Sequence, residues 1–80
     1  MKKLATSPWD YDLVETDDGR LVVVVLTGGS AAYEIATELR PEEAAAWRER
    51  GVEGILPVIE GMRLTPSRFR DRQCPIPEGY

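Results

Sequence analysis

Few side chains in this sequence have the chemistry of a catalyst or a metal ligand, and they lie far apart. Histidine is absent and Cys74 is the one cysteine, so the commonest metal ligand and the usual general base near neutral pH are missing. Asp10 and Asp12 share one face of an extended segment, and paired carboxylates can hold Mg²⁺ or exchange protons. No third ligand lies near them, so the pattern is typical of a solvated strand face. We expect no metal site and no cofactor.

Three other segments partly match known functional motifs. Asp17-Asp18-Gly19 begins like a calcium loop, but the later ligand positions are missing. Gly28-Gly29-Ser30 lacks the lysine and the following helix of a phosphate loop, and no histidine is present to activate the serine. Cys74 has arginines nearby that favour a thiolate, but it lies in an expected tail and is interpreted as incidental. The sequence therefore predicts that the chain is not an enzyme.

Basic side chains gather near the C-terminal end. Residues 63–80 hold four arginines and two acids, whereas residues 1–62 hold twelve acids and six bases. The four arginines are Arg63, Arg68, Arg70 and Arg72. They could bind an acidic partner or RNA phosphates, but pairing with the domain's own acids is the simpler interpretation. The net charge of -4 argues against nucleic acid and membrane as partners.

Three extended segments precede the helical part of the chain. Residues 9–15 alternate large apolar and acidic side chains, the period of a half-buried strand. Residues 21–26 are apolar throughout, as in a central strand covered on both faces. Residues 31–39 form the third predicted strand. Asp18-Gly19 and Gly28-Gly29 between them suit two-residue hairpin loops.

Loops of two residues determine which side chains share a face of this sheet. They pair Leu13 with Val24 in the first hairpin, and Val24 with Tyr33 in the second. One face, predicted to lie under the helix, then carries Trp9, Tyr11, Leu13, Val22, Val24, Leu26, Tyr33 and Ile35. Because a slip of one residue moves every side chain of a strand to the other face, the agreement of the two loops favours this register.

A helix is expected from Pro41 onward. Proline suits the first helical position, and the two glutamates that follow it interact favourably with the helix dipole. Apolar residues at steps of three and four make a stripe as far as Met62. Pro57 lies on the polar side and is expected to kink the helix. Two glycines in the middle leave open a pair of shorter helices.

These elements predict one α+β domain: a three-stranded antiparallel β-meander packed on one long helix, in the order β-β-β-α. The domain is expected over residues 8–64, after a flexible N-terminus at residues 1–7. Residues 65–80 are expected to form a short helical turn and an extended, proline-containing tail. The lone cysteine and a start without an apolar stretch favour the cytoplasm.

The second face of the sheet is expected to be bare, because the chain has only one long helix. It would be an apolar patch with an acidic rim, and such patches usually mark protein contacts. The partner-binding residues predicted in this way are Asp10, Asp12, Val14, Leu21, Val23, Val25, Ala32, Glu34 and Glu38. Two alternatives remain: the C-terminal segment covers the patch with Phe69 or Ile76, or two copies of the chain pack face to face.

Part of the chain resembles small bacterial toxin-immunity-type proteins. The residues that carry the resemblance are Tyr33-Glu34-Ile35, Leu39-Arg40-Pro41-Glu42-Glu43, Trp47, Gly51, Ile55 and Pro66-Ser67-Arg68-Phe69. In this family a strand leads into a helix that begins Leu-Thr-Pro-Glu-Glu, and here Arg40 replaces the threonine. The resemblance implies a compact, often acidic protein that neutralises a toxin domain by covering it. The acidic rim of the predicted patch would favour a basic domain as that partner. A homodimeric accessory subunit is the alternative function.

Overall fold

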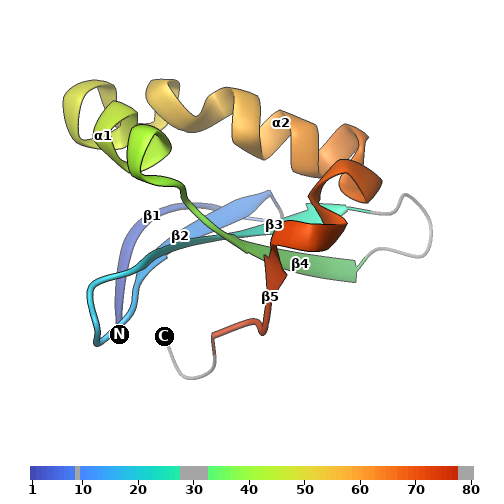
Figure 1. The fold of residues 1–80 in the computed structure, drawn as a ribbon, viewed down its shortest axis with the longest axis horizontal. Helices are drawn as coiled ribbons and strands as arrows, with labels where there is room; N and C mark the ends of the chain where they lie inside the picture. The colour runs from blue at the N-terminus through green and yellow to red at the C-terminus, as the bar shows by residue number, and fades with distance from the viewer. Residues whose placement is uncertain (9, 28–32, 78–80) are drawn as a thin grey trace.

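The computed structural model describes residues 1–8, 10–27 and 33–77, which form an antiparallel sheet under a layer of helices (Figure 1). The strands lie side by side in chain order: β1 (Lys2–Ser7), β2 (Tyr11–Glu15), β3 (Leu21–Thr27), β4 (Tyr33–Glu38) and β5 (Gln73–Cys74). The helical layer consists of α1 (Pro41–Arg50), the 3-10 segment η2 (Gly51–Ile55) and α2 (Leu56–Leu64), and a second 3-10 segment, η3 (Pro66–Arg72), leads into β5. The α+β class and the antiparallel meander are confirmed, but the described sheet has five strands instead of three.

The two additional strands lie at the two edges of the sheet. The segment at residues 2–7, expected to be flexible, pairs with β2 as strand β1. Part of the expected tail pairs with β4 at two positions as strand β5. Both strands depend on a neighbour that is already in place, so their own residues carry only a weak strand pattern.

The first hairpin has a three-residue loop, not the two-residue loop that was predicted. The N–H of Thr16 donates to the carbonyl oxygen of Arg20 at 2.8 Å, and the N–H of Gly19 donates to the carbonyl oxygen of Thr16 at 3.0 Å. Gly19 has a φ of 88°, the left-handed conformation that a loop of this length requires at its last position. Leu13 therefore pairs with Val23, and the side chains of β3 face the opposite way from the prediction.

The second hairpin also departs from the predicted register, by three positions. Val24 pairs with Ala36 instead of Tyr33. The predicted turn at Gly28-Gly29 lies outside the described residues, as does Trp9 at the predicted start of β2. The observed pairing differs from the predicted pairing by one residue in the first hairpin and by three in the second. Because both numbers are odd, the side chains of β2 and β4 lie on their predicted faces of the sheet, and those of β3 lie on the opposite faces from the prediction.

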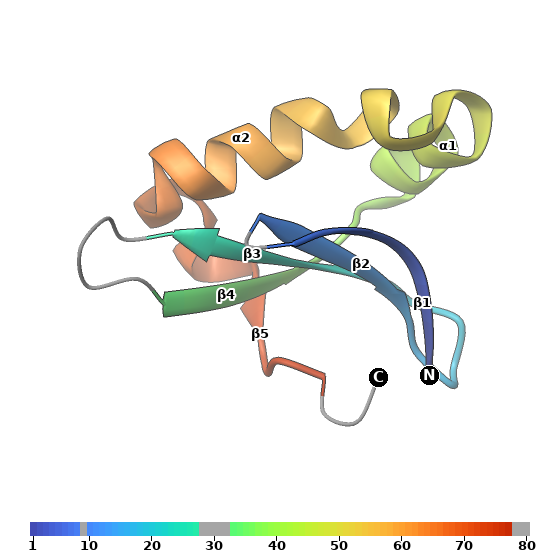
Figure 2. The same ribbon diagram turned by 180° about the vertical axis from the view of Figure 1, so that it is seen from behind.

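The main core lies between the sheet and the helical layer (Figures 1 and 2). Its buried members are Leu13, Leu21, Val23, Val25, Ile35, Leu39, Ile55, Val58, Ile59 and Met62. All of these side chains are apolar, and their removal from water is the dominant stabilising contribution in a domain of this kind.

The predicted long helix is present over residues 41–64, with the 3-10 segment η2 in its middle between α1 and α2. A Cβ on Gly54 would lie 2.3 Å from the carbonyl oxygen of Ala46 in α1, so only glycine fits this close approach. Pro57 is exposed in the first turn of α2. A missing N–H costs little there, so Pro57 begins a helix and does not kink one.

Replacing either of two buried threonines on neighbouring strands by valine is expected to change the free energy of unfolding, in opposite directions for the two positions. The hydroxyl of Thr27 donates to the carbonyl oxygen of Arg63 at 2.7 Å, near the end of α2 where carbonyls lack helical partners. The Thr37 hydroxyl is fully buried and has no hydrogen-bond partner in the described part of the chain. Valine preserves the shape of both side chains. We expect Thr27→Val to lower the free energy of unfolding by about 1 kcal/mol, and Thr37→Val to raise it by about 1 kcal/mol.

Urea unfolding of the two single variants measures both changes against wild type. A Thr37→Val variant less stable than wild type would mean that its hydroxyl has a partner. A Thr27→Val variant as stable as wild type would mean that the bond to the end of α2 contributes nothing.

Candidate functional site

The sheet face away from the helices, which we call the outer face, carries Asp12, Val22, Val24, Glu34 and Ala36. Its apolar centre is a small second core and not a bare patch. The two valines and the alanine are each 1% exposed, and Cys74 of β5 packs against them. The C-terminal segment continues from β5 on this side of the sheet (Figure 2).

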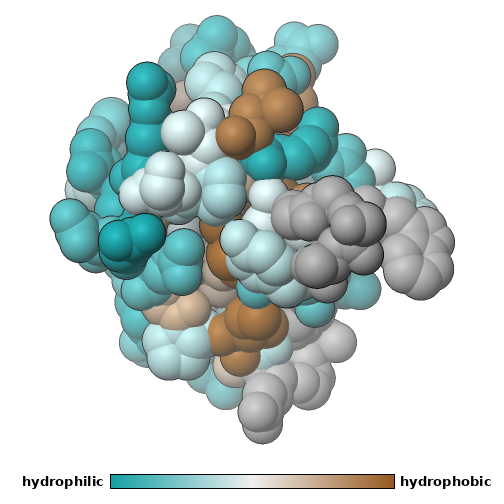
Figure 3. All heavy atoms as spheres, turned by 90° about the vertical axis from the view of Figure 1, so that its right-hand side faces the viewer, coloured by the Kyte–Doolittle hydropathy of each residue, from teal (hydrophilic) through white to brown (hydrophobic). Residues whose placement is uncertain are grey.

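The alternative in which the C-terminal segment covers this face is therefore the one that agrees with the structure, although the covering residue differs from the prediction. Phe69 packs against the main core, and Ile76 is 40% exposed. Along the end of the β3–β4 hairpin, the coloured hydrophobic side chains form small, separate areas among hydrophilic ones (Figure 3). Face-to-face packing of two copies was inferred from an exposed apolar centre on the outer face. That centre, formed by Val22, Val24 and Ala36, is buried within the chain.

The apolar residues predicted to bind a partner are not at the surface. Leu21, Val23 and Val25 belong to the main core under the helices, which corrects the prediction and follows from the three-residue loop. Val14 is fully buried. Ala32 lies outside the residues that the structure describes. Among the described residues, the apolar side chains of the predicted patch are therefore buried.

Two of the four acids predicted for the rim are neutralised within the chain. Asp10 forms an ion pair with Arg63 of α2. Glu38 pairs with Arg20 at 3.2 Å. An exposed acid that already has an internal cation attracts a basic partner less than a free one.

The other two predicted acids, Asp12 and Glu34, lie on the outer face. Asp12 on β2 accepts a hydrogen bond from the Thr6 hydroxyl of β1. Glu34 on β4 is exposed and makes no hydrogen bond or ion pair with any other described residue. Of the four predicted acids, Glu34 is thus the one best placed to meet a partner.

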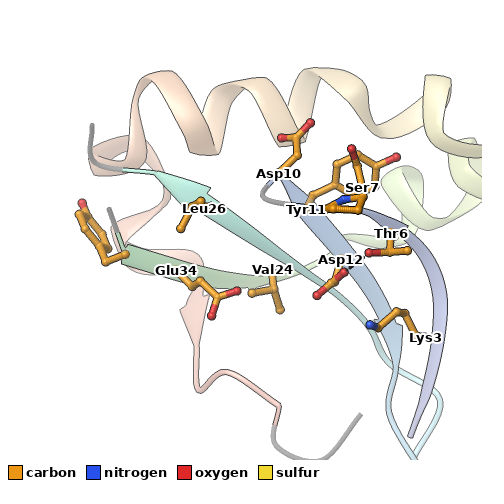
Figure 4. Close-up of a pocket in the computed structure, with 11 residues that line it drawn as sticks. Lys3, Thr6, Ser7, Asp10, Tyr11, Asp12, Val24, Leu26 and Glu34 are labelled. Carbon is orange, nitrogen blue, oxygen red and sulfur yellow. Dashed lines mark hydrogen bonds between the residues drawn. The ribbon is translucent and has the colours of Figure 1, made fainter. Parts of the chain in front are cut away.

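An open hollow of about 730 Å³ lies at the outer face, between the end of β1 and the start of β4. It is lined by residues that include Lys3, Thr6, Asp12, Val24, Leu26 and Glu34. Figure 4 shows Asp12, Val24 and Glu34 directed away from the helices, while Asp10 points toward α2. The volume lies in the usual range of ligand sites, roughly 300–1,000 Å³.

The strand pairings explain why these residues gather in one place. Thr6 pairs with Asp12, and Asp12 pairs with Val24, so the three form one row across the sheet. Leu26 and Glu34 pair in the next row. Rows two residues apart point to the same face, so an apolar strip on β3 is flanked by charged side chains on its neighbours.

The lining of the hollow combines apolar, polar and charged side chains. Within the described residues, no group of three histidine, cysteine, aspartate or glutamate side chains is placed to hold a metal ion. The lining contains neither histidine nor cysteine. An apolar floor with a few polar groups around it is the composition of a recognition surface.

The arginines near the C-terminal end pair in part with the domain's own acids. Arg72 donates to both carboxylate oxygens of Glu43, at 2.5 and 3.3 Å, and to the carbonyl oxygen of Glu38 at 3.2 Å. This bidentate contact attaches the C-terminal segment to the start of α1. Arg68 and Arg70 are exposed. Two of the four arginines, including the partner of Asp10, therefore have a structural role.

Cys74 behaves as an apolar side chain. It packs against the second core on the outer face. Burial raises the pKa of its thiol, and the nearby Glu38 carboxylate adds to that increase. A raised pKa lowers the thiolate fraction at neutral pH, which disfavours the alternative of a reactive cysteine.

In the part of the chain that the structure describes, no helix combines the length and the apolar character needed to cross a lipid bilayer. No protein-family model matches the chain, and no curated protein or solved structure matches it either. The hollow and the residues around it are therefore the basis of the proposed function.

Proposed function

We propose that this chain is a protein-binding module that takes its partner at the hollow on the outer face. The observation that carries the proposal is the hollow itself. The half-buried Leu26 provides an apolar floor next to the buried Val24, and Lys3, Asp12 and Glu34 provide charges beside it. Protein interfaces combine these parts in the same way, with an apolar centre and a polar rim.

Neutralisation of a toxin domain is the form of this function that we favour. The residues that carry the resemblance to immunity-type proteins lie between 33 and 69, in β4, α1, η2 and η3 and in the connection before α1. The net charge of -4 would speed association with a basic domain. Arg40 stands where that family has a capping threonine, and here Glu43 accepts a hydrogen bond from the Arg40 N–H at 2.8 Å, so the start of α1 still has a cap.

Leu26→Lys tests the hollow as the binding site. Leu26 is half-buried and lines the hollow, so a lysine there changes the floor without entering the main core. The partner would be captured from native lysate with the wild-type chain, purified, and titrated by calorimetry. Because truncating a central interface residue commonly costs about 2 kcal/mol or more, we expect affinity to fall at least about thirtyfold.

Leu64→Lys is the matched control, because Leu64 at the end of α2 is 78% exposed and does not line the hollow. It is expected to bind like wild type, and thermal unfolding shows whether both variants fold. A partner that binds Leu26→Lys as tightly as wild type would contradict the site. An empty capture with a bait of twice the monomer mass would favour the homodimeric accessory subunit instead.

A further inference from the structure

In the part of the chain that the structure describes, the outer edge of β4 has a strand beside it only over part of its length. On that edge β5 pairs with β4 only at Ala36 and Thr37. The next residues of the C-terminal segment include Pro75 and Pro77, and proline has no N–H to continue a ladder. Among the described residues, Tyr33–Ile35 is therefore paired with β3 on one side and with nothing on the other.

This free edge borders the hollow. Tyr33 and Glu34 both line the hollow, and the Tyr33 side chain is 50% exposed. Figure 4 shows the Glu34 carboxylate on the same side of the sheet as Val24. Glu34 makes no ion pair with any described residue and lines the hollow beside the half-buried Leu26, so its carboxylate suits a guanidinium group. Guanidinium binds carboxylates through two parallel hydrogen bonds.

The opposite edge of the sheet is less suitable for a basic segment. The outer side of β1 is also unpaired within the described residues, but Lys2 and Lys3 lie in that strand. Lysines on an edge strand discourage further pairing. The unpaired part of β4 carries no lysine or arginine and one carboxylate, Glu34.

We propose that the β4 edge at Tyr33–Ile35 takes an extended segment of the partner as an added strand, and that an arginine of this segment enters the hollow and pairs with Glu34. Residues directly opposite each other on neighbouring strands share a face. A side chain opposite Glu34 would thus point to the outer face, where the hollow is. In this mode of recognition, backbone hydrogen bonds provide affinity and the side-chain pocket provides specificity. The proposal rests on the proposed function and specifies the partner's contacting segment.

The test is selection of displayed random nonapeptides on the purified full-length chain, followed by synthesis of the enriched sequence. The enriched peptides are expected to share one arginine. Because a hydrogen bond to a charged group contributes about 1.5–3 kcal/mol, Glu34→Gln should weaken the synthetic peptide at least about tenfold. Glu49→Gln is the matched control, since Glu49 is exposed on α1 and does not line the hollow, and it should leave affinity unchanged.

Methylation of alternate backbone nitrogens in the same peptide tests the strand pairing. Only alternate residues of an added strand bond to the edge, so one methylation pattern should abolish binding and the other should not. The proposal is overturned if no peptide is enriched, if enriched peptides lack arginine, if Glu34→Gln binds as well as wild type, or if both methylation patterns are tolerated. A natural partner that depends on Leu26 but not on Glu34 would overturn this inference and leave the proposed function intact.

Discussion

Val23→Lys is expected to unfold the domain. Val23 is 0% exposed and lies in the main core, whose members are all apolar. Burying an ammonium group without a partner costs several kcal/mol, and the whole core of a chain this short supplies only about 3–5 kcal/mol. Far-ultraviolet circular dichroism with thermal melting should show no cooperative transition for this variant.

Leu26→Lys is the matched control for the same strand. Leu26 has the opposite facing from Val23 and is half-buried at the hollow, so this variant should fold and melt cooperatively. The register built on two-residue loops predicts the reverse, with Val23 at the surface and Leu26 in the core. A folded Val23→Lys together with an unfolded Leu26→Lys would show that the three-residue loop is wrong.

Gly54→Ala is expected to be the most damaging glycine substitution. The added Cβ would lie 2.3 Å from the carbonyl oxygen of Ala46 and 2.6 Å from its carbonyl carbon. The atoms in the way belong to the backbone, which cannot rotate to another conformer as a side chain can. Overpacking typically costs 1–3 kcal/mol, and we expect a loss of about 3 kcal/mol in the free energy of unfolding. Urea unfolding measures it.

Gly19→Ala is the control for this prediction. A Cβ on Gly19 meets nothing within 4 Å, although its φ is 88°. The left-handed conformation alone costs an alanine about 1 kcal/mol. If Gly54→Ala proved no more harmful than Gly19→Ala, η2 and α1 would not approach each other as closely as described.

The elements with local signals could be predicted from the sequence. The β2–β3–β4 meander and the start of α1 at Pro41 follow from alternation, a run of valines, and a proline before two acids. β1 and β5 could not be predicted in the same way. Each is an edge strand whose own residues carry only a weak strand pattern. β1 joins β2 across a short connection, and β5 pairs with β4, which is distant in the sequence.

The predicted register of β3 was wrong because its residues do not indicate which face of the sheet each side chain lies on. Residues 21–26 are apolar throughout, so either set of alternate side chains satisfies a buried face. The choice depended on loop length alone. Asp18-Gly19 fits a loop of two residues, and Asp17-Asp18-Gly19 fits a loop of three with glycine last.

The candidate site was predicted only in part. Asp12 and Glu34 line the hollow as acids of the expected rim. Thr6 was missed because β1 was not predicted. Leu26 was missed because the predicted register assigned it to the face under the helix.

Photo-crosslinking from position 26 is the most direct test of the central claim, that the partner sits in the hollow. A photoactivatable amino acid would replace Leu26 in one chain and Leu64 in another, and both would be irradiated in the native cell. We predict one covalent adduct with a different protein from position 26, and none from position 64. An adduct from position 64 alone, or an adduct between two copies of this chain from position 26, would contradict the claim.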